Sequence, residues 1–451
     1  MNDGTIIMQR VLIIALDYPP KASSASRRPF GLSKYLPEYG WEPVVLTISE
    51  RGRNEDDHPG TKVIESDLLS KPRFIANLLD VIHKRHKETE VNDGYDSSRG
   101  TYYRPCGEKR WITKLRNCLL YPDRYFISWY RKAVKGYLQF ATEFPVDAII
   151  STAKPFTAHL IARRIKSRTQ VPWVADFRDL WPHWRFYEND TDYRSLKYLL
   201  DRILTRWVLS SADALVTVSP PLKSMLRKRF RAKRVYSIPN GFDPQDYTDG
   251  IKPDPSMFLI TYTGHVRTDC QDPEILLRAT SELVKTKNID RRLIKVRFYG
   301  EITNELLRDI DKHAIKDVVQ AEGIRRPRND ILPKQMESSL LIIFAALDPA
   351  NTGTATGKIY EYLAAKRPVL AIGKPEGADV VEDILNSTCA GVYARTLEEI
   401  KQTIMLYYNQ FTQKGEVGYH GISSEIDKFS YKEMAMRYAR VLDKIVKVRA
   451  L

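Results

Sequence analysis

The sequence predicts an α/β protein with two Rossmann-like, doubly wound domains. The chain has 451 residues, which is too many for one ordinary hydrophobic core and suits two domains of roughly 200 residues each. Short β-branched runs alternate with longer helical stretches in two successive series, a pattern typical of parallel sheets that are buried on both faces. Hydrophobic residues make up 43% of the chain and charged residues 28%, as in folded globular proteins.

The two series define the predicted domains. Strands are expected at 11–16, 43–48, 148–151, 172–175 and 214–218, and then at 258–263, 294–299, 318–321, 340–344 and 368–372. An Asn-Gly turn at 240–241 separates the series. We therefore expect an N-terminal domain at 1–238 and a C-terminal domain at 239–426. A capping box of Ser430 and Glu433 opens a last helix within 427–451, for which packing back on the N-terminal domain is one alternative.

The formal net charge of +15 attracts anions, which include phosphates, anionic lipid headgroups and nucleic acid. Within 104–140, residues such as Arg110, Trp111, Trp129 and Tyr130 place rings and basic groups along predicted helix, a composition that suits a membrane surface. The alternative is a basic helix whose apolar face packs on its own domain. No short nucleic-acid-binding motif is present, so we expect no nucleic-acid partner.

The sequence shows no sign of export. The apolar run at 11–16 is far too short for a membrane span or the apolar region of a signal peptide. We expect a cytoplasmic protein, with peripheral attachment to the inner face of the cell membrane as an option. The four cysteines lie far apart and form no CxxC pair, which favours neither a zinc site nor a disulfide framework.

The clearest local signal is a Gly/Thr loop followed by a short helix, at 352–368. Exposed N–H groups and the helix dipole at the start of such a helix favour an anion such as a diphosphate, and Gly353 and Gly357 allow close approach of the backbone. Lys358 adds a positive charge. Glu361 lies one turn later on the same face and can accept hydrogen bonds from ribose hydroxyls. The alternative is a surface ion pair between Lys358 and Glu361 on a purely structural helix.

Five segments carry a family resemblance that covers nearly the whole chain. They are 11–20 (VLIIALDYPP), 173–182 (WVADFRDLWP), 212–219 (ADALVTVS), 238–243 (IPNGFD) and 356–368 (TGKIYEYLAAKRP). In this order they resemble retaining glycosyltransferases of family 4, which have the GT-B architecture of two Rossmann-like domains facing a central cleft. Because ligands of open α/β sheets bind at the carboxyl ends of the strands, we expect the site in that cleft.

The resemblance assigns roles in the C-terminal domain and also shows departures. Glu361 matches the second glutamate of a paired-glutamate motif, which holds the nucleotide ribose, and Lys358 lies where the leaving diphosphate is contacted. Gly353 stands where the first glutamate is expected, so the identity of the donor sugar cannot be carried over. The family commonly has an arginine directly after the glycine that corresponds to Gly264. Here Arg267 is a substitute for it, or else a solvated loop residue.

A Ser/Arg loop at 19–28 stands where the family has a Gly-rich loop over the donor phosphates. Arg27 is the better phosphate candidate in it. The resemblance and the Gly/Thr loop together predict a donor site formed by Ser24, Arg27, Gly264, Arg267, Thr354, Thr356, Gly357, Lys358 and Glu361.

In the N-terminal domain, Asp176, Arg178 and Asp179 follow the strand expected at 172–175, and His159 begins a helix after another strand. This places all four near carboxyl ends of strands, and we predict them as catalytic residues. The alternative for Arg178 is a structural bridge between the two carboxylates, and the alternative for His159 is a locally satisfied side chain.

We therefore predict a hexosyltransferase that moves a sugar from a nucleotide-sugar donor to a lipid-linked glycan in bacterial surface polysaccharide assembly, such as capsule or lipopolysaccharide. The resemblance implies retention of configuration. No metal and no other cofactor is expected, because the chain's own cations can neutralise the leaving group. Three alternatives stay open: a nucleotide-sugar epimerase of the same fold, a catalytically silent partner subunit suggested by Gly353, and a nucleic-acid binder.

Overall fold

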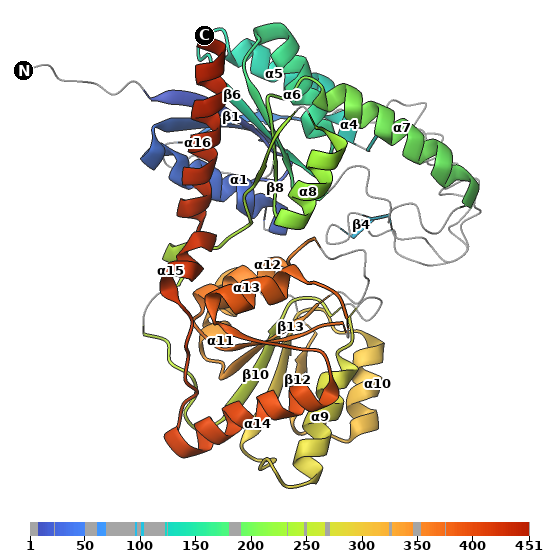
Figure 1. The fold of residues 1–451 in the computed structure, drawn as a ribbon, viewed down its shortest axis with the longest axis vertical. Coiled ribbons are helices and arrows are strands. Elements are labelled where there is room, and N and C mark those ends of the chain that lie inside the picture. The colour runs from blue at the N-terminus through green and yellow to red at the C-terminus, as the bar shows by residue number, and fades with distance from the viewer. Residues whose placement is uncertain are drawn as a thin grey trace, which may run out of the picture. The chain divides into compact units, whose positions relative to one another are not determined.

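The computed structural model describes residues 8–21, 23–49, 61–68, 95–96, 101–102, 122–123, 125–179, 191–231, 233–247, 250–266, 271–323, 327–345, 353–374 and 376–450, with backbone alone for 95–96, 101–102, 191–198 and 449–450. The contacts within the chain divide it into two compact units (Figure 1). Unit 1 comprises Met1–Pro239 with Met434–Leu451, and unit 2 comprises Asn240–Glu433. This division lies beside the boundary predicted from the Asn-Gly turn.

Unit 1 contains a seven-stranded sheet in the order β3-β2-β1-β6-β7-β8-β9, in which all neighbouring strands run parallel. Its strands are β1 (Gln9–Ile14), β2 (Trp41–Ile48), β3 (Lys62–Ser66), β6 (Ala148–Ala153), β7 (Trp173–Phe177), β8 (Ala214–Thr217) and β9 (Arg234–Ser237). A separate antiparallel pair joins β4 (Tyr95–Asp96) to β5 (Thr101–Tyr102). Central strands such as β6 are buried along their whole length, as expected for a parallel sheet that is covered on both faces.

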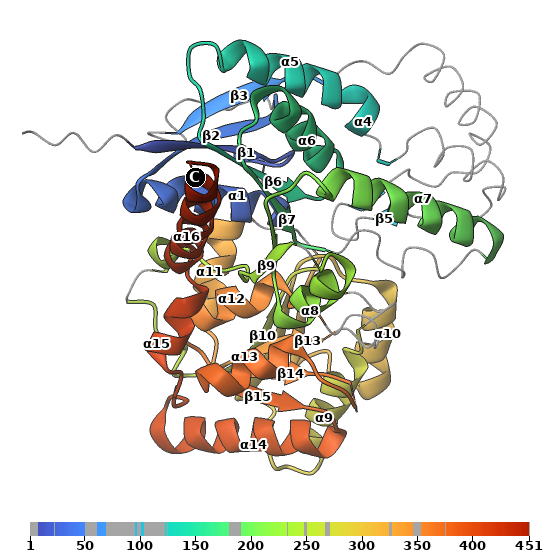
Figure 2. The ribbon, with the colours of Figure 1, turned by 45° about the horizontal axis from the view of Figure 1, so that its top comes forward.

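Helices cover both faces of the unit 1 sheet. The helices are α1 (Ser24–Tyr35), η1 (Leu36–Tyr39), α4 (Tyr125–Ser128), α5 (Tyr130–Phe140), α6 (Thr157–Thr169), α7 (Thr191–Leu209), α8 (Pro220–Arg229) and α16 (Tyr431–Ala450). Buried residues of α5, α6, α7 and α8 share one hydrophobic cluster with β1, β2 and β6. Figure 2 shows α1 and α16 side by side, away from α5 and α6.

Unit 2 repeats the architecture with a six-stranded parallel sheet in the order β12-β11-β10-β13-β14-β15. Its strands are β10 (Phe258–Thr263), β11 (Ile294–Tyr299), β12 (Val319–Glu322), β13 (Leu340–Phe344), β14 (Val369–Ile372) and β15 (Gly391–Ala394). Its helices are η4 (Pro244–Asp246), α9 (Glu274–Lys285), α10 (Asn304–His313), α11 (Arg328–Met336), α12 (Gly357–Ala364), α13 (Val380–Thr388), α14 (Leu397–Lys414), α15 (Ser423–Ile426) and η6 (Asp427–Phe429).

Two hydrophobic clusters fill the two faces of the unit 2 sheet. One joins α9, α10 and α14 to the sheet, and the other joins α11, α12 and α13 to it. Polar side chains fix where the helices begin. Thr303 caps α10, Asp379 caps α13, and Thr396 forms a capping box with Glu399 at the start of α14, which satisfies backbone N–H groups that have no partner within the helix.

Five strands of the described residues were not predicted. Two of them, β4 and β5, form the separate antiparallel pair, and the other three, β3, β9 and β15, lie at edges of the parallel sheets. Each of these three edge strands is only partly buried, with polar or small residues in place of a continuous apolar run. An edge strand has a neighbour on one side only and is less covered, so its sequence carries a weaker hydrophobic signal.

Strand β7 is longer than predicted, which changes the position of Asp176. The expected strand ends at residue 175, whereas β7 continues to Phe177. Asp176 therefore lies within the sheet, opposite Thr152 and Val216, and its side chain is fully buried. The strand contains an ionisable residue, so an apolar pattern alone ends too early.

About half of the basic, aromatic stretch at 104–140 lies outside the described residues, namely 104–121 and 124. In its described part, Trp129, Ala133 and Tyr137 are fully buried in the core of unit 1. For residues 125–140 the structure therefore supports packing on the chain's own domain. Among the described residues, no helix combines the length and the apolar character that a membrane span requires.

A buried ion pair joins distant parts of unit 1. The Arg28 guanidinium on α1 donates to both carboxylate oxygens of Asp176, at 2.9 and 3.0 Å. It also donates to the carbonyls of Ile238 and Pro239 and to the Tyr438 hydroxyl on α16. Burial alone lowers the pKa of Arg28, but the charges and hydrogen bonds of Asp176 and Tyr438 together outweigh it, and the net pKa is raised. The last helix thus belongs to the polar core of unit 1.

Replacing Arg28 with methionine should destabilise unit 1 by about 3–5 kcal/mol, because the Asp176 carboxylate would remain buried without its cation. Urea unfolding followed by circular dichroism measures the change. Arg10→Met is the matched control, since Arg10 and Glu42 form a partly exposed ion pair that contributes less than about 1 kcal/mol. Equal losses in the two variants would contradict the importance of the buried pair.

Candidate functional site

The strand order of unit 2 reverses between β10 and β13, and this places a ligand site. From β10 the chain first adds β11 and β12 on one side, and then returns to add β13, β14 and β15 on the other. In open parallel sheets, ligands bind outside the carboxyl ends of the strands at such a switch point. Gly264 follows β10 directly, and α12 follows β13 along the chain. The predicted donor residues of unit 2 therefore lie where the topology expects a ligand.

Lys358, in the first turn of α12, is held against the end of β10. Its ammonium lies 5.1 Å from the centroid of the Tyr262 ring. Gly264 has a φ of +117°, and a Cβ added there would lie 2.5 Å from Lys358 Cε. Glycine is needed at this position for the backbone conformation and for the close approach of the lysine side chain. The structure thus brings together two of the predicted donor residues, Gly264 and Lys358.

Within the described residues, the start of α12 is open. The Thr356 side chain makes no capping hydrogen bond to the helix there. A Cβ added at Gly357 would meet no described atom within 4 Å, so packing against the described residues does not require glycine at this position. Thr354 is exposed, whereas Gly353 is buried. An uncapped helix start beside open space and a lysine suits an anion.

Glu361 lies one turn into α12 and is 7% exposed, which is not the surface ion pair of the alternative interpretation. Its Oε2 accepts a hydrogen bond from Gln335 Nε2 at 3.3 Å, and its Oε1 lies 3.5 Å from Arg328 Nε. Gln335 also donates to Thr263 Oγ1 at 3.0 Å. The carboxylate is therefore oriented from α11 and, through Gln335, from the end of β10.

Arg328 links Glu361 to the segment that opens unit 2. Its Nη1 lies 2.7 Å from Asp246 Oδ2. Burial lowers the pKa of Arg328, but the charges of Glu361 and Asp246 outweigh it and the net pKa is raised. The sequence analysis missed both Arg328 and Gln335. A signal was present, because these two residues share the face of α11 that also carries the buried Leu332.

In unit 1 the strand order reverses between β1 and β6, and Arg178 ties the end of β6 and its loop to the start of α1, the helix that follows β1. It donates to the carbonyls of Ala153 and Lys154, each at 2.9 Å, and to that of Ala25 at 3.1 Å. The alternative interpretation, a bridge between two carboxylates, is thus replaced by a bridge between backbone carbonyls. Asp179 lies 3.4 Å from the Lys154 ammonium and is partly exposed.

His159 on α6 is fully buried, so its ring does not reach the surface in this structure. Its Nδ1 shares a 2.7 Å hydrogen bond with the Ser151 hydroxyl, which also accepts from the Trp173 indole N–H at 2.7 Å. Burial lowers the pKa of His159 to about 3, although Asp176 acts in the opposite direction. His159 is therefore neutral at physiological pH. His159 and Asp176 are both buried in the interior of unit 1, where they can support the loops at the switch point.

Of the remaining predicted donor residues, Ser24 and Arg27 are described by the structure and Arg267 is not. Ser24 is the exposed first residue of α1, which Ser23 caps, and Arg27 is partly buried one turn later. The neighbouring Arg28, which the sequence analysis missed, is the residue that enters the core. Its position explains this, because Arg28 lies four residues before the buried Leu32 on the same helix face. Arg267 lies outside the described residues.

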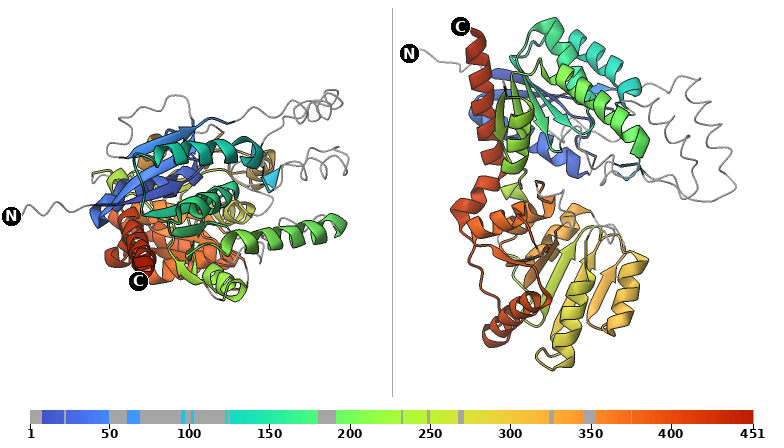
Figure 3. Two further views of the ribbon diagram at one scale, coloured as in Figure 1. Left: turned by 90° about the horizontal axis from the view of Figure 1, so that it is seen from above. Right: turned by 45° about the vertical axis from the view of Figure 1, so that its right-hand side comes forward.

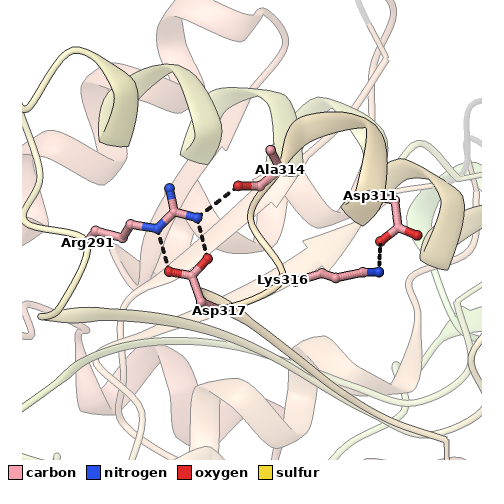
Figure 4. A pocket seen from close by; sticks show the side chains of 5 residues that line it. All are labelled: Arg291, Asp311, Ala314, Lys316 and Asp317. Atoms are coloured by element: carbon pink, nitrogen blue, oxygen red, sulfur yellow. Dashed lines mark hydrogen bonds and ion pairs between the residues drawn. The ribbon is translucent and has the colours of Figure 1, made fainter.

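A cavity of about 530 Å³ at another place in unit 2 is lined by Arg291, Asp311, Ala314, Lys316 and Asp317 (Figure 4). Its charges pair with one another, Arg291 with Asp317 and Lys316 with Asp311. These side chains form an open, self-neutralised surface hollow and include none of the predicted site residues. Among the described residues, no three His, Cys, Asp or Glu side chains gather in a way that could hold a metal ion.

The burial of His159 predicts a pH-dependent stability. Between pH 6.5 and 4 the unfolded imidazole binds a proton that the folded one does not, so the free energy of unfolding should decrease as the pH falls through this range. The contribution is at most roughly 1.4 kcal/mol per pH unit. Urea unfolding at several pH values should show a smaller slope for His159→Gln than for the wild type. Replacing His420, which is exposed, should leave the slope unchanged, and an unchanged slope in both variants would contradict the assignment.

Comparisons with known proteins agree with this architecture. The sequence matches the family described as Glycosyltransferase Family 4 over residues 91–246. No curated protein sequence gives a significant match. Among solved structures, a sucrose-phosphate synthase from Thermosynechococcus elongatus is similar with a TM-score of 0.60 and 12% identity, over 98% of this chain and 100% of the other.

Two further structures show the same similarity. A glycosyltransferase from Rickettsia africae has a TM-score of 0.58 and 14% identity, over 98% of this chain and 99% of the other. The Anabaena protein HepE, solved in complex with UDP-glucose, has a TM-score of 0.59 and 13% identity, over 97% of this chain and 100% of the other. The predicted fold class is confirmed: the two parallel sheets and their flanking helices form the two-domain α/β fold of GT-B glycosyltransferases.

Proposed function

We propose that this chain is a retaining glycosyltransferase that moves a hexose from a nucleotide-sugar donor to a lipid-linked glycan in bacterial surface polysaccharide assembly. The family match over residues 91–246 and the GT-B fold support the reaction class. Structures of the similar HepE protein contain UDP and glucose, which supports a nucleotide-sugar donor. The observation that carries the proposal is the open start of α12, with Lys358 held beside Gly264 and Glu361 oriented behind it.

The donor diphosphate binds at the start of α12 in this proposal. The N–H groups of the first turn and the positive end of the helix dipole face it, and the space beside Gly357 admits a phosphate oxygen. The Lys358 ammonium neutralises the negative charge that grows on the leaving diphosphate as the glycosidic bond to the donor sugar breaks. Stabilisation of this kind is commonly the largest part of enzymatic rate enhancement.

Glu361 holds the nucleoside in this proposal, by accepting hydrogen bonds from the ribose hydroxyls. A carboxylate does this best when it is ionised and fixed in orientation, and Arg328 and Gln335 provide both conditions. Arg328 and Gln335 are therefore positioning residues. The donor sugar lies beyond the diphosphate, where Gly353 supplies no side chain.

Transfer with retention of the anomeric configuration requires no base from the protein when the departing phosphate takes the proton of the acceptor hydroxyl. In unit 1, Arg178 ties the start of α1 to the end of β6, and the partly exposed Asp179 binds acceptor hydroxyls in this proposal. Ser24 and Arg27, at the start of α1, are proposed as further phosphate-binding residues. We propose that no metal is needed, because lysine and arginine neutralise the diphosphate.

The test is incubation of the purified protein with a panel of nucleotide sugars, with and without membrane lipid extract and with and without EDTA. Free nucleoside diphosphate should be released from one donor, only when lipid is present, and equally in EDTA. Release without any acceptor would indicate hydrolysis, and an epimerised donor would indicate an epimerase. If no nucleoside diphosphate were released from any donor, a non-catalytic partner subunit would be favoured and the proposal would be overturned.

Two variants connect this activity to the start of α12. Lys358→Met should lower the transfer rate about 100-fold or more, since it removes charge from the leaving-group site. Gly357→Ala should weaken donor binding about tenfold, because its methyl group fills the space left for phosphate while meeting no atom of the described residues. Both should unfold at the wild-type temperature. Lys414→Met, an exposed change on α14, is the control, and an equal loss of activity in it would discount the assignment.

Removing Arg328 tests the positioning of Glu361. Arg328→Met should raise the KM for the donor about tenfold and leave kcat nearly unchanged, because it weakens ribose binding in the ground state and the transition state alike. Arg328→Lys keeps the charge and should recover part of the affinity. Arg308→Met, on the exposed face of α10, should have wild-type kinetics. A lower kcat with an unchanged KM would show that Arg328 acts in another way.

A further inference from the structure

Helix α7 carries apolar side chains on its outer side as well as on its inner side. On the inner side, Val208 and Leu209 are fully buried in the core of unit 1, together with the polar Asp201 and Thr205 at 1% and 0% exposed. On its outer side, Ile203 and Trp207 are 58% and 54% exposed, together with Leu199 and Leu200 at 49% and 46%. A helix that serves only its own domain places apolar residues inward and polar residues outward. The fold of unit 1 explains the inner apolar residues of α7 but not the exposed ones.

The exposed apolar side chains form one continuous stripe. Leu199, Ile203 and Trp207 are spaced by four residues, and Leu200 lies three residues before Ile203, so all four share one side of the helix. We call these four residues the α7 stripe. Single exposed apolar side chains are common, as with Leu406 on α14. Four on one side of one helix mark an interaction surface.

The charge beside the α7 stripe identifies the kind of partner. Arg202 and Arg206 are exposed on the same helix. The guanidinium of Arg163, on α6, lies 3.9 Å from the centroid of the Trp207 ring. Between Leu199 and Leu209 the acidic residue is Asp201, which is buried. The surface therefore combines apolar side chains, a tryptophan and positive charge, with no exposed acid on this part of the helix.

We propose that α7 docks the protein on an anionic lipid surface. The apolar stripe enters the boundary between headgroups and acyl chains, Trp207 lies at the headgroup level, and Arg202 and Arg206 pair with lipid phosphates. Figure 3 shows α7 along the outside of unit 1, with its N-terminal end extending beyond α6. This surface differs from the basic, aromatic stretch at 104–140, whose described rings are packed into the core. It does not depend on the proposed sugar transfer.

The test is flotation of the full-length protein with vesicles of phosphatidylcholine alone and of phosphatidylcholine with phosphatidylglycerol. The wild type should float with the anionic vesicles and much less with the neutral ones. Ile203→Ser with Trp207→Ser should reduce binding to anionic vesicles at least about tenfold. Arg202→Gln with Arg206→Gln should also reduce it, by roughly fivefold for each charge removed, and the remaining binding should lose its preference for phosphatidylglycerol.

The matched control is Leu406→Ser with Lys414→Gln, which removes one exposed apolar and one exposed basic residue from α14 of unit 2. It should float like the wild type. Thermal unfolding should be unchanged in every variant, since all the positions are exposed. Equal flotation of all variants would overturn the proposal. A wild-type protein that binds neither kind of vesicle would also overturn it. If the α7 variants changed the oligomeric state in light scattering while vesicle binding persisted, the α7 stripe would be assigned to a protein partner instead.

Discussion

Parallel pairing of the strands is the constraint on which the rest of this structure depends. In each main sheet all neighbouring strands run in the same direction, so every carboxyl end lies at one edge and every connection must cross back over a face. Helices therefore bury both faces, and loops with chemical groups gather at a single edge. The reversal of strand order then separates two neighbouring loops and leaves room between them. Arg178 ties the end of β6 to the start of α1 in unit 1, and Lys358 meets Gly264 in unit 2.

This constraint also explains which parts of the fold could be predicted from the sequence. The central strands, such as β10 and β13, are covered on both faces and appear as apolar runs, so their positions were predicted correctly. The edge strands β3, β9 and β15 lack that coverage and were missed. The end of β7 was misplaced because Asp176 interrupts the apolar run. A buried acid is indistinguishable from a loop acid until its partner, Arg28, is known to lie opposite.

The same reason limits prediction of the site. Motif and resemblance led to Lys358, Glu361 and Gly264, because glycine and charge at a helix start are local signals. The groups that orient Glu361 are not local: Gln335 and Arg328 come from α11, more than twenty residues earlier in the chain. In unit 1, Arg27 was preferred over Arg28. Helical periodicity would have favoured Arg28 as the inward residue, since it shares a face with Leu32 and Leu36.

The return of the last helix to unit 1 has a consequence for the order of folding during synthesis. Residues 434–451 pack with Met1–Pro239, so unit 1 lacks Tyr438 and the apolar side chains around it until unit 2 has been translated. Unit 2, in contrast, is one continuous segment and is complete when residue 433 leaves the ribosome. Nascent chains usually fold from the amino terminus onward. Here the unit that is translated first completes its native core last. Until α16 has been translated, Arg28 and Asp176 lack the contacts that this helix provides.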